Sequence, residues 1–325
     1  MALVTLPGIE SFLIGECKAL GARLGDVGDG WVAVLGDPEP VIAAAGTLRA
    51  VVEVMWRGPC DAVPGGLPRA ERLWCEGQWI NEGRRCGSAF AAVAQAAGGP
   101  RLLPAPDGPP GMVCLVDRRG DALVGQAIAW GLERRRPYRV ALMARSLNPA
   151  MGRAMAMASR ARPGDVFVDH FCGSGTILAE RAMLGPCRLV GVDLEAGAVD
   201  AAGRTLAGFA HAEAEMRVEV GVGDARALPF DDGSVTAVAT NPPFGHRLGR
   251  AADNADLYPR ALREAARVLR PRSRLVVLTG DRRHLRQALA ACGPALRVRS
   301  EGRVWLGGLE PILGVYDRTE ARLPG

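Results

Sequence analysis

Apolar and polar residues are spaced differently before and after residue 147. After it, short apolar runs, typical of buried strands, alternate with segments whose apolar residues recur every three or four positions, as on one face of a helix. The predicted strands are 165–171, 188–195, 217–225, 235–243 and 274–281. The predicted helices are 146–161, 173–185, 196–210, 258–270 and 284–293. Strands that alternate with helices form parallel βαβ units, so this half is predicted to be an α/β domain with a doubly wound sheet.

Two local signals add detail to this prediction. Residues 297–318 have the pattern of a β-hairpin, which would add an antiparallel strand to the parallel sheet. The helix at 146–161 has a marked start, because Ser146 or Asn148 can cap it and Pro149 fits its first turn.

The first half of the chain has the mixed pattern of a smaller α+β region. Its predicted elements are a helix at 8–22, a strand at 31–36, a helix running into a strand over 38–58, a helix at 86–97 and a hairpin at 112–131. Residues 99–111 are dense in proline and glycine and are predicted to form a linker or long loop.

Composition excludes several classes of protein. A chain of 325 residues with 48% hydrophobic and 23% charged residues is typical of a globular protein that has two domains, or one large domain with an appendage. No apolar run is long enough for a membrane span, and the N-terminus does not resemble a secretory signal. The eight cysteines and four histidines show neither a disulfide framework nor a metal-ligand pattern, so we expect a reduced cytoplasmic protein without a metal. A net charge of +5 is compatible with a nucleic-acid partner.

The segment VFVDHFCGSGTILAE contains the first chemical signal. It comprises a strand, a glycine turn and the start of a helix, an arrangement in which Gly173 and Gly175 let the backbone approach a ligand closely. Asp193, eighteen residues after Gly175, ends the next strand and can accept hydrogen bonds from ribose hydroxyls. The pair predicts a cofactor that contains adenosine.

The details favour S-adenosylmethionine over a nicotinamide cofactor. Leu178 stands where a dehydrogenase would carry its third glycine, and Asp169 precedes the turn, where an acid can lie near a cationic methionine group. Asp224 ends the third strand and is predicted to accept a hydrogen bond from the adenine amino group.

The stretch TNPPFG lies at the end of the fourth strand, at the same edge of the sheet. Consecutive prolines hold the turn rigid, so the Asn241 side-chain carbonyl and the Pro242 backbone carbonyl form a fixed pair of acceptors suited to an exocyclic amino group. Phe244 is predicted to stack on a planar base, and Arg247 and Arg250 to contact phosphates or base edges. Asn241, Pro242 and Phe244 are therefore the predicted catalytic residues.

The block DHFCGSGT, GVDLE, GDARALPF and TNPPFGHRLG resembles the class I S-adenosylmethionine-dependent amino-methyltransferases. The flanking phrases YRVALMARSLNPAMGRAMA and LPGIESFLIGECKALGA narrow the resemblance to the THUMP-linked RNA guanine-N2 methyltransferases, whose catalytic domain is of the UPF0020 type. ERRRPYR resembles the basic phrase that closes the THUMP module of this family. Two features depart from the family pattern: His170 replaces the usual proline, which would alter the stiffness of the turn, and the THUMP-like stretch is short and not notably basic.

The resemblance implies a fold, a domain division and a set of site residues. Residues 1–138 would form a ferredoxin-like and abbreviated THUMP-like RNA-binding region, and residues 139–325 a Rossmann-like catalytic domain with a seven-stranded mixed sheet that ends in an antiparallel hairpin. The implied cofactor-binding residues are Asp169, Cys172, Gly173, Gly175, Thr176, Asp193, Leu194, Asp224, Ala225 and Asn241. The implied RNA-binding residues are Pro243, Gly245, Arg247, Arg250, Arg135 and Arg136.

The resemblance further implies a monomer that methylates the N2 amino group of a guanosine in tRNA. Several alternatives stay open at this point: ribosomal RNA as substrate, methylation of adenine N6 in DNA or of glutamine N5 in protein, and an RNA-binding module with a vestigial cofactor fold. A nicotinamide oxidoreductase is a more distant alternative. The THUMP-like first half favours RNA. The chain is most similar in length to the THUMP-linked family members with a single catalytic domain, so the resemblance favours tRNA.

Overall fold

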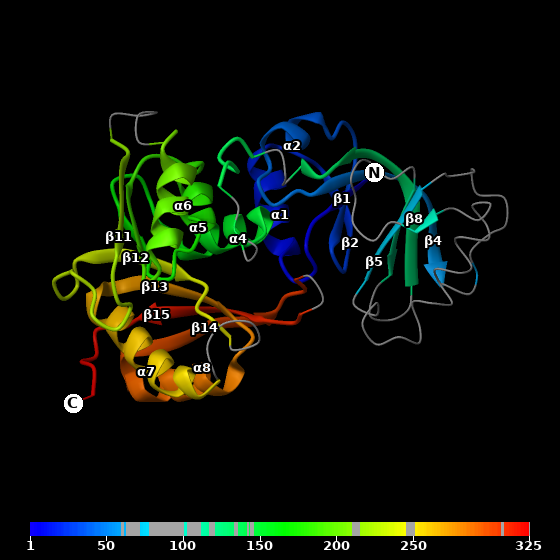
Figure 1. Cartoon of the computed structure of the whole chain (residues 1–325). Coiled ribbons are helices and arrows are strands. Elements are labelled where there is room, and N and C mark those ends of the chain that lie inside the picture. The colour runs from blue at the N-terminus through cyan, green and yellow to red at the C-terminus, as the bar shows by residue number, and fades with distance from the viewer. Residues whose placement is uncertain are drawn as a thin grey trace. The chain divides into compact units, whose positions relative to one another are not determined.

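The structure is a computed structural model that describes residues 1–59, 62, 72–77, 101–102, 112–116, 121–132, 136–141, 143, 146–209, 215–244, 251–306 and 309–324. It divides into two compact units (Figure 1). The first comprises Met1–Arg135 with Trp305–Gly308, and the second comprises Arg136–Val304 with Leu309–Gly325. The division falls after Arg135, whereas the sequence placed the boundary after residue 138.

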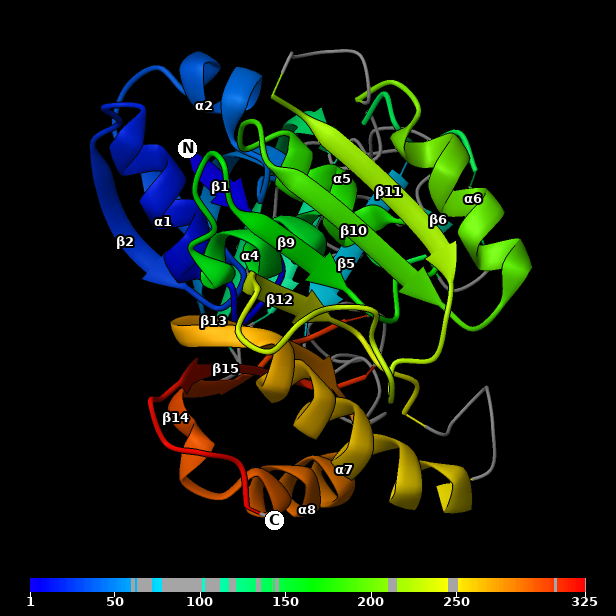
Figure 2. The same ribbon diagram turned by 90° about the vertical axis from the view of Figure 1, so that its left-hand side faces the viewer.

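The C-terminal unit contains a seven-stranded mixed sheet, which confirms the predicted fold class. Its strand order is β11-β10-β9-β12-β13-β15-β14 (Figure 2). The strands are β9 (Val166–Asp169), β10 (Arg188–Asp193), β11 (Arg217–Val222), β12 (Val235–Thr240), β13 (Leu269–Thr279), β14 (Leu296–Arg303) and β15 (Ile312–Arg318). The first five pair in parallel, while β15 pairs antiparallel with both β13 and β14, so the predicted terminal hairpin is present.

Helices cover both faces of this sheet, as a doubly wound fold requires. Helices α4 (Pro149–Ser159), α5 (Thr176–Ala182) and α6 (Ala196–Leu206) pack on one face. On the other face, α7 (Ala251–Val268) and α8 (Arg282–Cys292) bury Leu262 and Leu285 against Val168 and Val238 of the central strands.

The helix starts show which local signals were informative. Asn148 caps α4, because its side chain accepts a hydrogen bond from the Ala150 amide at 2.9 Å. Ser146, the other predicted cap, instead bonds to Ser174 of the glycine turn at 2.7 Å. The predicted start of α7 at residue 258 is wrong: the helix begins at Ala251 and contains Pro259. Proline is typical of a first helical turn, so the sequence pattern placed the helix start too late.

The N-terminal unit contains an eight-stranded sheet of order β2-β3-β1-β4-β8-β7-β5-β6 and two helices among its described residues. The strands are β1 (Ala2–Val4), β2 (Leu24–Gly28), β3 (Trp31–Val34), β4 (Ala50–Pro59), β5 (Arg72–Gly77), β6 (Arg101–Leu102), β7 (Met112–Val116) and β8 (Asp121–Trp130). The predicted hairpin at 112–131 is present as the antiparallel pair β7 and β8. The strands β1, β2, β5 and β6 were not predicted. The predicted helix at 86–97 lies outside the described residues, as does the loop at 99–111 except for β6.

Alternate residues along the strands of this sheet point to opposite faces, and each face has its own apolar cluster. Leu3, Val32 and Val51 pack with Leu13 of α1 (Glu10–Ala19) and Val41 of α2 (Glu39–Ala44). Their neighbours in sequence, among them Val4 and Trp31, form a second apolar cluster on the opposite face. The period-two alternation of a strand thus accounts for both clusters.

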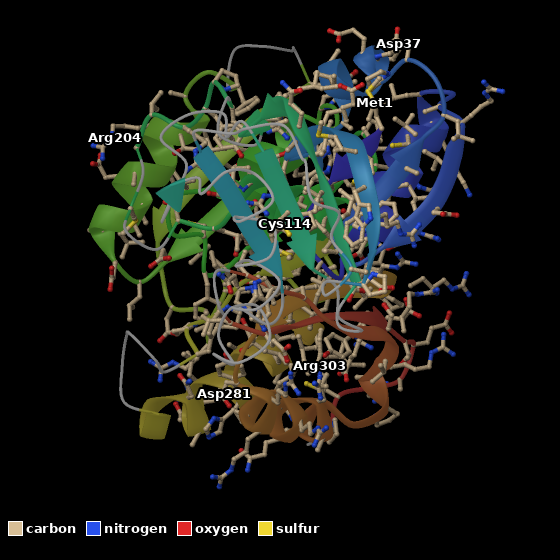
Figure 3. All side chains as sticks on the ribbon, turned by 90° about the vertical axis from the view of Figure 1, so that its right-hand side faces the viewer. Met1, Asp37, Cys114, Arg204, Asp281 and Arg303 are labelled. Carbon is tan, nitrogen blue, oxygen red and sulfur yellow. The ribbon has the colours of Figure 1, made fainter. Side chains whose placement is uncertain are left out.

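Within the described segments, no helix combines the length and the apolar character that a membrane crossing needs. Several cysteines in the described part of the chain are buried and have free thiols, namely Cys17, Cys114, Cys172, Cys187 and Cys292. Cys114 lies in β7 (Figure 3).

The packing of β10 against α5 leads to a stability prediction. A Cβ at Gly191 would lie 2.8 Å from Leu178 Cδ1 and 3.0 Å from Val220 Cγ1, whereas a Cβ at Gly197, at the start of α6, would meet nothing within 4 Å. Overpacking of this kind costs ~1–3 kcal/mol, so Gly191→Ala is expected to lower the free energy of unfolding by about that amount. Gly197→Ala, the matched control, is expected to be neutral or to stabilise by up to ~1 kcal/mol. Urea denaturation of both variants measures the difference, and equal stabilities would contradict the packing described here.

Candidate active site at the carboxyl ends of the strands

The strand order reverses between β9 and β12, and ligands of open α/β sheets bind at such a switch point, beyond the carboxyl ends of the strands. Asp169 ends β9, Asp193 ends β10, and Asn241 directly follows β12. The carboxyl ends of β9, β10 and β12 lie at one edge of the sheet (Figure 2), and the fold therefore brings the three predicted site residues to that edge.

The glycine turn is held by the end of β10. The Gly173 amide donates to Asp193 Oδ2 at 2.9 Å, and the Cys172 amide donates to the Val192 carbonyl at 3.1 Å. Gly173 has a φ of 51°, and a Cβ there would face open space, which fits a backbone approached by a ligand. Gly175 has a φ of 80° and caps α5, but its Cβ position is 3.3 Å from Ala202, so close packing of α6 also requires glycine there.

The Asp193 carboxylate has a fixed orientation. One oxygen accepts from Gly173, and the other accepts from the Glu195 amide at 3.0 Å. Each carboxylate oxygen has a second lone pair, so both can still accept from a ligand hydroxyl.

An apolar surface lies beside Asp193. Leu194, a predicted cofactor residue, is 69% exposed, and Val222 at the end of β11 is 61% exposed. The two exposed aliphatic side chains lie at the ends of neighbouring strands and can contact a planar ring such as adenine. Val222 was missed by sequence reasoning, since an apolar residue at a strand end is normally counted with the core.

Asp224 is bound more tightly within the protein than the sequence suggested. Its carboxylate accepts from Arg226 Nε at 3.0 Å and Nη2 at 2.8 Å, and from the Arg226 amide at 2.9 Å. Side-chain hydrogen bonds from Arg226 hold the pKa of Asp224 below its usual value. If Asp224 accepts a hydrogen bond from an adenine amino group, its carboxylate must bind that group and Arg226 at the same time.

Asp169 is a buried acid with one unused oxygen. Its Oδ1 accepts from Thr240 Oγ1 at 2.9 Å and from the Phe171 amide at 3.2 Å. Its Oδ2 is buried and has no hydrogen-bond partner within the described part of the chain. Burial raises the pKa of Asp169 to about 7, and the negative charge of Asp193 adds to this effect. A cationic group is the ligand that would best stabilise its ionised form.

Asn241 presents a second unused acceptor. The residue is half-buried, and its Oδ1 is buried without a hydrogen-bond partner among the described residues. Leaving such an acceptor unpaired costs about 1–3 kcal/mol, so an atom of this kind is suited to a ligand N–H donor.

The proline turn is anchored from the α7–α8 side. The Pro243 carbonyl accepts from Asn254 Nδ2 at 3.2 Å and from the Tyr258 hydroxyl at 3.0 Å. The ring of Phe244 lies against Gly280, where a Cβ would be 3.1 Å from Phe244 Cδ2. Sequence reasoning missed Asn254, Tyr258 and Gly280. The spacing of the first two, four residues apart on one helix, was the available signal.

The other predicted cofactor residues are buried next to the glycine turn or after β11. Cys172, Thr176 and Ala225 are buried, and the methyl group of Thr176 packs toward Gly152 of α4. Burial raises the pKa of Cys172 well above its usual range, which keeps the thiol protonated at neutral pH.

The predicted RNA contacts fall into two groups. Pro243 is part of the anchored turn, while the guanidinium group of Arg136 donates from Nε to the buried Glu180 carboxylate at 2.9 Å and the side chain is 13% exposed. An RNA contact of Arg136 stays a prediction that would have to coexist with this ion pair. Arg135, Gly245, Arg247 and Arg250 lie outside the described residues.

His170, at the family's proline position, is fully buried. Its ring lies 5.0 Å from that of Phe171, and neither ring nitrogen has a partner within the described segments. Burial lowers the pKa of His170 to about 4, so the imidazole is neutral at physiological pH. His170 thus fills buried space with an aromatic ring. The sequence prediction had considered only the stiffness of the turn.

The fold and the arrangement of this edge define a class I methyltransferase domain. Residues 136–312 match the model of the family described as UPF0020, RMKL-like, methyltransferase domain, and the chain belongs to this family. The match agrees with the predicted cofactor, S-adenosylmethionine.

Curated proteins that are similar to the chain include two tRNA methyltransferases. The tRNA (guanine(6)-N(2))-methyltransferase THUMP3 of Bos taurus is 30% identical over 184 residues, which cover 54% of this chain and 36% of the relative. The tRNA (guanine(6)-N2)-methyltransferase of Thermus thermophilus is 35% identical over 207 residues, which cover 62% of this chain and 59% of the relative. The matched segment therefore spans between about a third and three fifths of these two relatives.

Several solved structures match nearly the whole chain, among them one from Thermus thermophilus. TrmN from Thermus thermophilus has a TM-score of 0.68 and 26% sequence identity, and the match covers 98% of each chain.

The buried acid leads to a prediction of pH-dependent stability. Because burial raises the pKa of Asp169 in the folded state to about 7, the folded chain binds this proton more tightly than the unfolded chain, whose aspartates titrate near ~3.9. Its contribution to stability is therefore complete below ~pH 4 and is lost as the pH rises toward 7. Asp169→Asn removes this loss, so the variant should gain stability over wild type between pH 4 and 8, by an amount on the order of 1–4 kcal/mol.

Chemical denaturation of both proteins across this pH range measures the effect. Asp200→Asn, on the exposed surface of α6, is the control for a general change of charge and should show little pH-dependent difference. A difference between wild type and Asp169→Asn that does not vary with pH would contradict the buried, protonated acid.

Proposed function

We propose that the C-terminal unit transfers a methyl group from S-adenosylmethionine to the exocyclic N2 amino group of a guanosine in tRNA. The observation that carries this proposal is the buried, unpaired Oδ1 of Asn241, held at the switch point of a methyltransferase domain. An exocyclic amino group has the N–H donors that this acceptor lacks.

The residues at the strand ends fit the cofactor. Asp193 would accept hydrogen bonds from its ribose hydroxyls, Leu194 and Val222 would contact its adenine ring, and Asp169 would face its cationic methionine end. The unused Asp169 Oδ2 and the open backbone at Gly173 support this assignment. When bound, S-adenosylmethionine supplies an electrophilic methyl group on a sulfonium centre.

The chain itself would orient the acceptor. The N2 nitrogen of guanine is a weak nucleophile because its lone pair is delocalised into the ring. Hydrogen bonds from its two N–H groups to Asn241 Oδ1 and the Pro242 carbonyl would favour a pyramidal nitrogen whose lone pair points at the methyl group. Positioning of the reactants and electrostatic stabilisation would then account for most of the rate enhancement. The extra proton on N2 can leave after the transfer, so no histidine base is needed.

Phe244 would hold the base in place. A paired guanine must first be unstacked, at a cost of a few kcal/mol. Stacking on an aromatic ring is worth ~1–3 kcal/mol per base and would offset part of this cost. The contact of Phe244 with Gly280 limits the positions of the ring before any base arrives.

The names of the relatives support tRNA and the guanine N2 atom as substrate. Both curated relatives described above are named as tRNA (guanine(6)-N2)-methyltransferases, so guanine 6 is the first position to examine. Adenine N6 and glutamine N5 present a similar planar amino group. The relatives are named as RNA methyltransferases, however, which favours guanine in RNA over these two substrates. That the N-terminal unit binds RNA, and that the protein acts as a monomer in the cytoplasm, are further parts of this proposal.

Separating the acceptor site from the cofactor site tests the proposed roles. Asn241→Ala removes the unpaired acceptor and should lower the rate of methyl transfer to tRNA by about 10²–10³-fold, the usual effect of losing one such electrostatic contact. Its affinity for S-adenosylmethionine should stay within about threefold of wild type, since other residues bind most of the cofactor.

Asp193→Ala is the contrasting variant, because its main effect should be a weaker affinity for S-adenosylmethionine. Methyl transfer is measured with labelled cofactor, and affinity by calorimetry. A fully active Asn241→Ala protein would show that the proposed role of this side chain is wrong.

A further inference from the structure

The proline turn cannot be fixed by its own amides. Pro242 and Pro243 lack N–H groups, so hydrogen bonds can hold this part of the backbone only through its carbonyls. The Pro243 carbonyl accepts two hydrogen bonds, from Tyr258 and from Asn254. Both donors lie on α7, four residues apart, and both side chains are buried.

A second layer of hydrogen bonds orients these two donors. The Tyr258 hydroxyl lies 2.6 Å from Thr279 Oγ1 at the end of β13, and this Oγ1 accepts from the Asp281 amide at 2.9 Å. Since the Tyr258 proton is donated to Pro243, the Thr279 hydroxyl must donate to Tyr258. The second N–H of Asn254 Nδ2 is donated to Asp281 Oδ2 at 3.0 Å.

Asp281, which is labelled in Figure 3, links Asn254 to the start of α8. Its Oδ1 accepts from the His284 amide at 3.1 Å as a helix cap, and its Oδ2 lies 2.7 Å from His284 Nδ1. Burial alone would raise the pKa of Asp281, but the hydrogen bonds from His284 and Asn254 outweigh burial and hold the pKa below its usual value. The carboxylate is therefore charged and keeps the Asn254 amide in one orientation.

We propose that Tyr258 and Asn254 are positioning residues for methyl transfer. By holding the Pro243 carbonyl on the α7 side, they fix the turn so that Asn241 Oδ1 and the Pro242 carbonyl stay free for the amino group of the substrate. This inference rests on the proposed function. A displacement of about 1 Å in a reacting group can lower a rate by about 10²-fold, so the turn has to be held rigidly.

The same junction supports the ring of the predicted base platform. Gly280 lies between Thr279 and Asp281, and the Phe244 ring packs on it. The end of β13 therefore contacts the turn through hydrogen bonds and through van der Waals packing. Stability alone would not require buried polar donors, since apolar pairs of the same shape can stabilise a core equally well.

Tyr258→Phe tests the proposal, with Tyr316→Phe as the matched control. Both tyrosines are fully buried in the same core cluster, but the Tyr316 hydroxyl donates to Glu301 at 2.8 Å and does not contact the turn. Tyr258→Phe should lower kcat for tRNA methylation about 10–100-fold with little change in the KM for S-adenosylmethionine. Tyr316→Phe should retain the kcat of wild type. If Tyr258→Phe folds poorly, Asn254→Ser takes its place as the test. This variant shortens the other donor to Pro243 and should lower kcat by a similar factor.

A spectroscopic readout tests the anchoring without relying on activity. Labelling proline with ¹³C at the carbonyl and phenylalanine with ¹⁵N selects the Pro-Phe pairs of the chain, which are 229–230 and 243–244. In Tyr258→Phe, the signal of the 243–244 pair should move, because its carbonyl loses a donor, while that of the 229–230 pair should stay in place. In Tyr316→Phe neither should move.

The outcomes separate the two levels of the proposal. Wild-type kcat in Tyr258→Phe, or an unmoved 243–244 signal, would overturn the positioning role. If the wild-type protein methylated no guanosine, the proposed function would fail, and the labelled spectra would still decide whether Tyr258 anchors the turn.

Discussion

The hydrogen bond from Thr240 Oγ1 to Asp169 Oδ1, 2.9 Å long, joins the ends of the two strands between which the sheet reverses its order. The glycine turn leaves β9 directly after Asp169, and the proline turn leaves β12 directly after Thr240. Both turns therefore start from one linked pair of residues. In the proposed reaction, the distance between a methyl donor at the first turn and an acceptor at the second would depend on this link, because neither turn has a regular structure of its own.

Each turn is then completed by partners far away in sequence. Asp193 accepts from the amide of Gly173, and the α7 side chains bind the carbonyl of Pro243. These hydrogen bonds do not use Asp169 Oδ2 or Asn241 Oδ1, and both oxygens are buried and unpaired within the described part of the chain. Two unpaired buried acceptors cost stability, and a ligand that brings N–H donors or positive charge would recover that cost.

Much of this arrangement could be predicted from the sequence. The alternation of strands and helices places Asp169, Asp193 and Asn241 at the carboxyl ends of parallel strands, and the fold then requires that they share one edge. Contacts between side chains on different elements could not be predicted in this way. The binding of Asp224 by Arg226 and the anchoring of Pro243 by Tyr258 depend on three-dimensional placement, and Pro259 hid the early start of α7.

The central claim is that this edge delivers a methyl group to the N2 atom of a guanosine in tRNA. It is tested most directly by incubating the purified protein with unmodified tRNA and labelled S-adenosylmethionine, then separating the nucleosides by liquid chromatography and mass spectrometry. The account predicts label in N2-methylguanosine, with far less in a parallel reaction that contains Asn241→Ala protein. Label in methylated adenosine, or no label in any nucleoside of the wild-type reaction, would contradict it.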